Sequence, residues 1–185
     1  MNLANRVTIA RIFLVPIFMI ILLTRIPQYG DFLAALIFII AASTDGLDGY
    51  IARSRKQVTN LGKLMDPLAD KLLVSAALIS LVELDLIKAW VAIVIIGREF
   101  AVSGLRSIAA SEGVIIQASK LGKYKTVSQI VAISVILLHD LPFNIHQILP
   151  FNISIIGSIL LYIAVGFTVV SGIDYFIKAK RLLHK

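Results

Sequence analysis

Apolar residues fill six segments of the chain, which are separated by short stretches rich in polar residues, proline or glycine. A helix needs about 20 mostly apolar residues to cross the hydrocarbon core of a bilayer. The segments are close to that length, so the pattern predicts an all-α integral membrane protein of six transmembrane helices in one domain, residues 1–185. The predicted spans are residues 7–23, 32–53, 61–82, 86–110, 121–138 and 153–178.

The first apolar segment allows one alternative, a cleaved signal peptide. The segment follows Arg6, and signal peptides likewise begin with a positively charged region that is followed by an apolar run. However, Arg11 interrupts the run, and no small-residue cleavage site follows it. A retained first helix is therefore favoured.

Composition and charge support a membrane protein and limit its partners. Hydrophobic residues make up 58% of the chain, above the roughly 45–50% of soluble domains. The absence of cysteine excludes disulfides and thiolate metal sites, and the net charge of +7 suits anionic lipid or phosphorylated substrates. The sequence lacks the interleaved basic and aromatic residues that would indicate a nucleic-acid-binding surface.

The distribution of basic residues predicts the orientation in the membrane. An even number of spans places both termini on one side, and that side carries every Lys and Arg except Arg25 and Lys88. Cytoplasmic segments of membrane proteins are enriched in Lys and Arg. Both termini are therefore predicted to lie in the cytoplasm, with the chain in the plasma membrane.

Four acidic residues interrupt the second and third apolar segments: Asp45, Asp48, Asp66 and Asp70. A carboxylate inside a span is unfavourable by about 2.5–3.5 kcal/mol on insertion scales, so the group needs compensation. The spacings i,i+3 and i,i+4 place each pair on one helical face. A short link makes the two helices antiparallel neighbours, so the pairs can meet. Hard divalent cations such as Mg²⁺ or Mn²⁺ prefer such oxygen ligands.

Two other interpretations of the acidic residues stay open at this point. They can pair with Arg53, Lys63 and Lys71 in a structural ion network, or they can form the path of a cation or proton transporter. The transporter is disfavoured because the acids lie near one face of the membrane and no trail of charge continues through the later spans. Neither alternative explains two face-matched pairs flanked by Gly46, Gly49 and Gly62.

The same region carries a resemblance to a known family. Residues 45–70 read D-x2-D-G-x2-A-R-x8-G-x3-D-x3-D, which matches the CDP-alcohol phosphatidyltransferase motif at every fixed position. The resemblance implies six transmembrane helices, a polar cavity open to the cytoplasm, a homodimer and two divalent metal ions, Mg²⁺ or Mn²⁺. It implies that Asp70 is both a metal ligand and the general base. The metal ligands that it implies are Asp45, Asp48, Asp66 and Asp70.

The resemblance also assigns a site for the CDP-linked lipid. Residues 5–11 are similar to the start of the family's first helix, which adds two candidate contacts to those within the motif. The CDP-lipid-binding residues that it implies are Asn5, Thr8, Gly49, Arg53 and Gly62.

A less specific resemblance concerns the acceptor alcohol. Residues 98–106 and 120–126 are similar to stretches of the phosphatidylglycerophosphate synthase branch, typically bacterial, which implies CDP-diacylglycerol as donor and glycerol 3-phosphate as acceptor. A dianionic acceptor needs cations. The candidates are Arg98, Arg106, Lys120 and Lys123, whereas Lys125 is interpreted as general cytoplasmic charge, and Glu99 is expected to pair with an arginine. Other acceptors, namely inositol phosphate, serine or a phospholipid, stay open.

Overall fold

The computed structural model is all-helical in its described part. It describes the backbone of residues 3–27, 29–54, 60–113, 120–139 and 153–183, and the side chains of residues 7–27, 29–44, 68–113, 121–139 and 153–180. Six helices occupy these residues, one in each predicted segment, which confirms the all-α prediction. The helices are α1 (Leu3–Leu23), α2 (Gly30–Ser54), α3 (Asn60–Glu83), α4 (Ala89–Ser111), α5 (Lys120–Leu137) and α6 (Ile153–Leu183).

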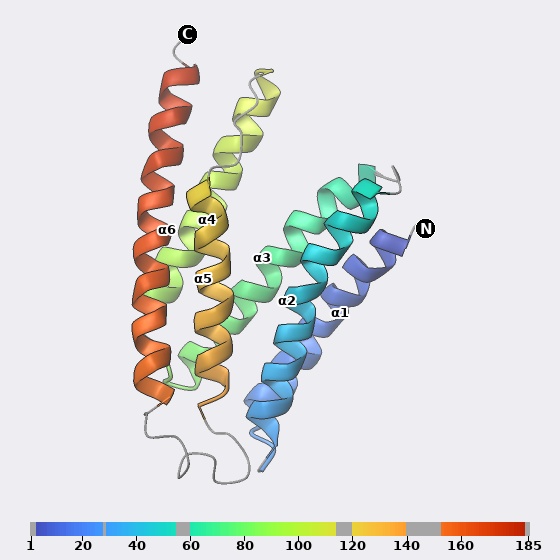
Figure 1. Ribbon diagram of the computed structural model, residues 1–185, viewed down its shortest axis with the longest axis vertical. Helices are drawn as coiled ribbons and strands as arrows, with labels where there is room; N and C mark the ends of the chain where they lie inside the picture. Colours follow the sequence, from blue (N-terminus) through green and yellow to red (C-terminus); the bar gives the residue numbers. More distant parts are fainter. Residues whose placement is uncertain (1–2, 28, 55–59, 114–119, 140–152, 184–185) are drawn as a thin grey trace.

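The helices pack as two groups of three. In Figure 1, α1, α2 and α3 lie together on the right, and α4, α5 and α6 lie together on the left. α1 packs against α2 and α3, while α6 packs against α5 and α4. The start of α1, the end of α2, the start of α3 and the end of α6 all lie toward the upper end of the view. This arrangement gathers the polar residues of several helices at one end.

A short turn fixes α3 antiparallel to α4. The backbone N–H of Leu86 donates to the Leu81 carbonyl at 3.0 Å, and Asp85 adopts a left-handed φ of 57°. Asp is one of the residues that tolerate this conformation, because its short polar side chain can hydrogen-bond locally. The acidic sequence of the turn therefore suits the tight connection.

The core is apolar, and so is much of the outer surface. The rings of Phe18 on α1 and Phe38 on α2 are fully buried with centroids 5.9 Å apart. On α6, Gly157 allows close approach to α5, because a Cβ there would lie 2.8 Å from Ile136 Cγ1. Large side chains such as Ile93, which is 70% exposed, face outward. An outer surface of this kind suits a surrounding of lipid.

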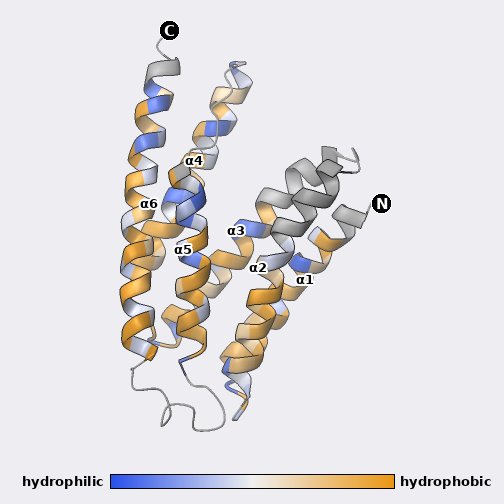
Figure 2. Ribbon diagram, in the orientation of Figure 1, coloured by the Kyte–Doolittle hydropathy of each residue, from blue (hydrophilic) through white to orange (hydrophobic). Residues whose placement is uncertain are grey.

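Hydropathy differs among the six helices. By length and composition, one helix in the described residues, Ile153–Lys180 within α6, is long and apolar enough to cross a membrane. Val7–Leu23 and Gly30–Thr44 are shorter apolar stretches. Figure 2 shows apolar residues along the lower part of the helices and hydrophilic residues toward the upper part of α4, α5 and α6. Six membrane spans therefore stay a prediction.

Candidate active site

A hollow of about 600 Å³ lies among α3, α4, α5 and α6. Its lining is strongly charged, and the cations outnumber the carboxylates. Cation-lined clefts attract and hold anions, most strongly those that can accept several hydrogen bonds at once. The hollow therefore has the chemistry of a phosphate site. Its cationic residues are Lys71, Arg98, Arg106, Lys123 and Lys125, and its carboxylates are Asp70 and Glu99.

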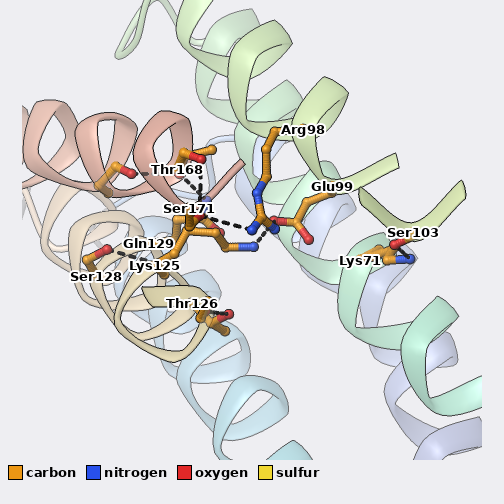
Figure 3. A network of polar contacts seen from close by, with 12 residues as sticks. Lys71, Arg98, Glu99, Ser103, Lys125, Thr126, Ser128, Gln129, Thr168 and Ser171 are labelled. Carbon is orange, nitrogen blue, oxygen red and sulfur yellow. Dashed lines mark hydrogen bonds and ion pairs between the residues drawn. The ribbon is translucent and has the colours of Figure 1, made fainter. Parts of the chain in front are cut away.

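Arg98 on α4 is held from several directions (Figure 3). Its Nη2 donates to Ser171 Oγ on α6 at 2.9 Å, and its Nη1 lies 3.6 Å from Glu99 Oε1. The guanidinium carbon lies 5.6 Å from the centroid of the Tyr175 ring, within cation–π range. A Cβ at Gly172 would stand 3.2 Å from Arg98 Cγ, so the glycine keeps α6 clear of the arginine stem.

Lys125 on α5 lies deep in the same network. It is only 4% exposed, and its ammonium pairs with the carboxylate of Glu99. One turn further along α5, Gln129 donates to Thr168 Oγ1 on α6 at 2.8 Å. These contacts tie a polar face of α5 to α4 through Glu99 and to α6 through Thr168.

Lys71 joins α3 to α4 at the other side of the hollow. Its ammonium donates to the hydroxyl of Ser103 on α4. Asp70, its neighbour in sequence, also lines the hollow. Because Asp66 is one helical turn before Asp70 in continuous α3, the two share a face, as the spacing predicts.

The four aspartates belong to the last turns of α2 and the first turns of α3. Asp45 and Asp48 belong to α2 and Asp66 belongs to α3, but their side chains lie outside the described residues. In Figure 1 the end of α2 and the start of α3 lie together at the upper end of their group. The helical backbone of both segments thus agrees with two pairs on neighbouring helices, and the described carboxylate of the motif, Asp70, lines the cationic hollow.

The first helix contributes a buried polar pair beside the motif. Thr8 and Arg11 are 1% and 2% exposed, and Arg11 Nη2 lies 3.4 Å from Thr44 Oγ1, the residue directly before Asp45. Thr8 is buried and does not belong to the described lining of the hollow. The side chains of the other predicted CDP-lipid and acceptor residues, Asn5, Gly49, Arg53, Gly62 and Lys120, lie outside the described residues.

Comparison with known sequences relates the chain to a protein family. The profile of the CDP-alcohol phosphatidyltransferase family matches residues 1–170. The chain belongs to that family. The resemblance carried by the aspartate motif is thereby confirmed over nearly the whole chain.

Several relatives in the CDP-alcohol phosphatidyltransferase family match the chain almost end to end. A Bacillus subtilis (strain 168) protein, named CDP-diacylglycerol–glycerol-3-phosphate 3-phosphatidyltransferase, is 52% identical over 96% of this chain and 94% of its own. Proteins of the same name from Haemophilus influenzae and Rickettsia felis are 39% and 38% identical, each over at least 95% of both chains.

A divalent metal fits the donor chemistry of this family member. The family generally depends on divalent metal. Among the described residues no cluster of three or more potential ligands occurs, since the side chains of all predicted ligands but Asp70 fall outside them. The predicted donors are all carboxylates, which are hard oxygen ligands suited to Mg²⁺ or Mn²⁺.

The structure adds Ser103 and Tyr175 to the lining of the hollow, and sequence analysis missed both. Arg98, Arg106 and Lys123, which are predicted to bind the acceptor phosphate, line the hollow, and Glu99 pairs with Arg98 as expected. Lys125 is a correction, because it is buried and ion-paired instead of being a general surface charge. Its position one helical turn before Gln129, which places both side chains on one face of the helix, was the available signal.

Proposed function

We propose that this chain transfers the phosphatidyl group of CDP-diacylglycerol to glycerol 3-phosphate, giving phosphatidylglycerol phosphate and CMP. The observation that carries the proposal is the hollow, in which a carboxylate of the family motif stands beside a set of cations. The names of the relatives support the same donor and acceptor. The enzyme is then a phosphatidylglycerophosphate synthase of phospholipid biosynthesis.

The donor side of the reaction belongs to the aspartate motif. Asp45, Asp48, Asp66 and Asp70 would hold the metal, which we propose to be two ions of Mg²⁺ or Mn²⁺. When bound, such ions neutralise charge on the diphosphate and favour the departure of CMP. The cytidine diphosphate would contact the motif and the start of α1, through Asn5, Thr8, Gly49, Arg53 and Gly62.

The acceptor side belongs to the cationic hollow. Arg98, Arg106 and Lys123, together with Lys120, would hold the phosphate of glycerol 3-phosphate, and arginine suits this task because its fork of N–H donors matches phosphate oxygens. In this arrangement the primary hydroxyl of the acceptor would face Asp70, which lines the same hollow.

The chemical step joins the two sides. Asp70 accepts the proton of the acceptor hydroxyl, and the oxygen attacks the β-phosphorus of CDP-diacylglycerol. The new P–O bond forms as the bond to the CMP oxygen breaks, so the phosphatidyl group moves and CMP leaves with the electron pair. A positioned general base of this kind contributes about 10²- to 10⁴-fold to the rate.

We further propose six membrane spans with both termini and the hollow on the cytoplasmic side of the plasma membrane, and a homodimer. The gathering of hydrophilic residues toward one end of the helices supports the orientation (Figure 2). The outward-facing apolar side chains support the lipid surroundings. A water-soluble acceptor such as glycerol 3-phosphate needs a site open to the cytoplasm, which this orientation provides.

The test is CMP release by the purified enzyme from CDP-diacylglycerol. We expect release only with glycerol 3-phosphate and with Mg²⁺ or Mn²⁺ present. A panel of inositol phosphate, serine and a phospholipid tests the acceptor. Release with one of these and none with glycerol 3-phosphate would contradict the acceptor assignment while keeping the reaction class.

A further inference from the structure

Glu99 is an unexpected residue in a hollow suited to an anion. Its side chain is 16% exposed and lines the hollow with the cations. A carboxylate at this position repels a bound phosphate, so it opposes the binding that the surrounding cations favour. Its presence calls for a compensating role.

The contacts of Glu99 indicate that role. The same atom, Oε1, lies 3.6 Å from Arg98 Nη1 and pairs with the ammonium of Lys125. The two cations come from different helices, α4 and α5, and their side chains are 11% and 5% exposed. Two buried cations side by side repel each other unless a counter-ion lies between them. Glu99 is that counter-ion (Figure 3).

Arg98 keeps donor capacity in this arrangement. Ser171 takes Nη2, Glu99 faces Nη1, and the Tyr175 ring covers the guanidinium. Among the described residues, Arg98 Nε has no hydrogen-bond partner. The guanidinium is therefore fixed in direction without all of its five N–H groups being used. A fixed donor loses less conformational freedom when it binds a ligand.

We propose that Glu99 is a positioning residue for the acceptor: it holds Arg98 and Lys125 together as one preformed cation pair for the phosphate of the acceptor. This inference rests on the proposed function. Glu99 does not itself contact the substrate. Its loss therefore weakens binding of glycerol 3-phosphate, and it leaves the CDP-lipid site and the chemical step at Asp70 in place.

The test is Glu99→Gln, which keeps the shape of the side chain and removes its charge. We expect the KM for glycerol 3-phosphate to rise about tenfold, the size of one lost contact to a charged group. The KM for CDP-diacylglycerol and kcat should stay near their wild-type values. A direct titration of the purified enzyme with glycerol 3-phosphate should show the same loss of affinity.

Matched variants separate positioning from folding. Glu83→Gln removes the same charge from an exposed site at the far end of α3 and should change neither KM. Glu99→Asp keeps the charge and should recover part of the affinity. The double variant Glu99→Gln/Lys125→Gln removes the buried ammonium of Lys125 together with its counter-ion, so it remains measurable if the single variant is unstable. The KM of the double variant for glycerol 3-phosphate should rise by a factor smaller than the product of the factors for Glu99→Gln and Lys125→Gln measured singly.

Two results would overturn the inference. An unchanged or lower KM for glycerol 3-phosphate in Glu99→Gln would mean that the carboxylate does not position the two cations for the acceptor. An equal loss of kcat/KM for both substrates would mean a general structural role. Failure of the proposed function is distinct, because wild-type enzyme would then release no CMP in response to glycerol 3-phosphate.

Discussion

The two sides of the proposed site are built in different ways. The acidic side comes from residues 45–70, where two neighbouring helices carry carboxylates at helical spacing. The cationic side is assembled from α3, α4 and α5, and α6 holds Arg98 in place through Ser171 and Tyr175. In this proposal a local motif supplies the metal ligands and the base, whereas tertiary packing assembles the proposed acceptor site. Damage to the first side should reduce turnover, and damage to the second should weaken acceptor binding.

Metal removal should have the largest effect and should act on the acidic side alone. Treatment of the purified enzyme with EDTA is expected to bring CMP release below detection, because the diphosphate then lacks its counter-charge. Calorimetric titration with glycerol 3-phosphate should still show binding. Activity should return with Mg²⁺ or Mn²⁺. Full activity in EDTA would contradict the metal assignment.

Asp70→Asn should be the most damaging substitution within the described hollow. We expect kcat to fall by about 10²- to 10⁴-fold, the range for loss of a general base. The KM for glycerol 3-phosphate should change little, because the cations remain. Asp174→Asn is the control, since Asp174 pairs with Lys178 along α6 outside the lining of the hollow. Near wild-type turnover of Asp70→Asn with metal bound would refute its role as base.

Arg98→Lys should affect the cationic side, in contrast to Asp70→Asn, which affects the acidic side. Lysine keeps the charge but cannot reproduce the fork of donors that reaches Ser171 and faces Glu99. We expect the KM for glycerol 3-phosphate to rise about tenfold to a hundredfold, as a few lost charged hydrogen bonds would give. Lys88→Arg, at an exposed residue before α4, is the control. A raised KM for CDP-diacylglycerol alone would place Arg98 on the donor side.

Gly172→Ala should give the smallest effect and the most specific one. The added Cβ would stand 3.2 Å from Arg98 Cγ, so the arginine must shift by a few tenths of an ångström. We expect the KM for glycerol 3-phosphate to rise by a factor of about 2–5, because overpacking of this size is worth about 1 kcal/mol. Gly166→Ala on the same helix meets nothing within 4 Å and should behave as wild type. Equal effects of the two variants would mean that the close packing of Gly172 against Arg98 does not affect acceptor binding.

The contrast between a local acidic motif and a cationic side assembled by tertiary packing explains what the sequence could predict. The six helices follow from six apolar segments, because length and hydropathy are local properties. The faces shared by the aspartates follow from their spacing in the same way. Arg98, Arg106 and Lys123 could be proposed because charges within or beside apolar segments need a reason.

The contacts of the acceptor side could not be predicted in this way. Nothing in the periodicity of α6 indicates that Ser171 and Tyr175 meet Arg98, which is far from them in sequence. The burial of Lys125 depends on how α5 packs against α4 and α6, and an unpacked helix would expose the same lysine. These contacts are tertiary, so they required the structure.

The central claim is the transfer itself, and the identity of the lipid product tests it most directly. Purified enzyme would be incubated with CDP-diacylglycerol, isotope-labelled glycerol 3-phosphate and Mg²⁺, and the lipids would be analysed by mass spectrometry. The account predicts labelled phosphatidylglycerol phosphate in equal amount to the CMP released. Release of CMP without incorporation of the label into lipid would contradict the account. Incorporation of another alcohol in place of glycerol 3-phosphate would contradict it as well.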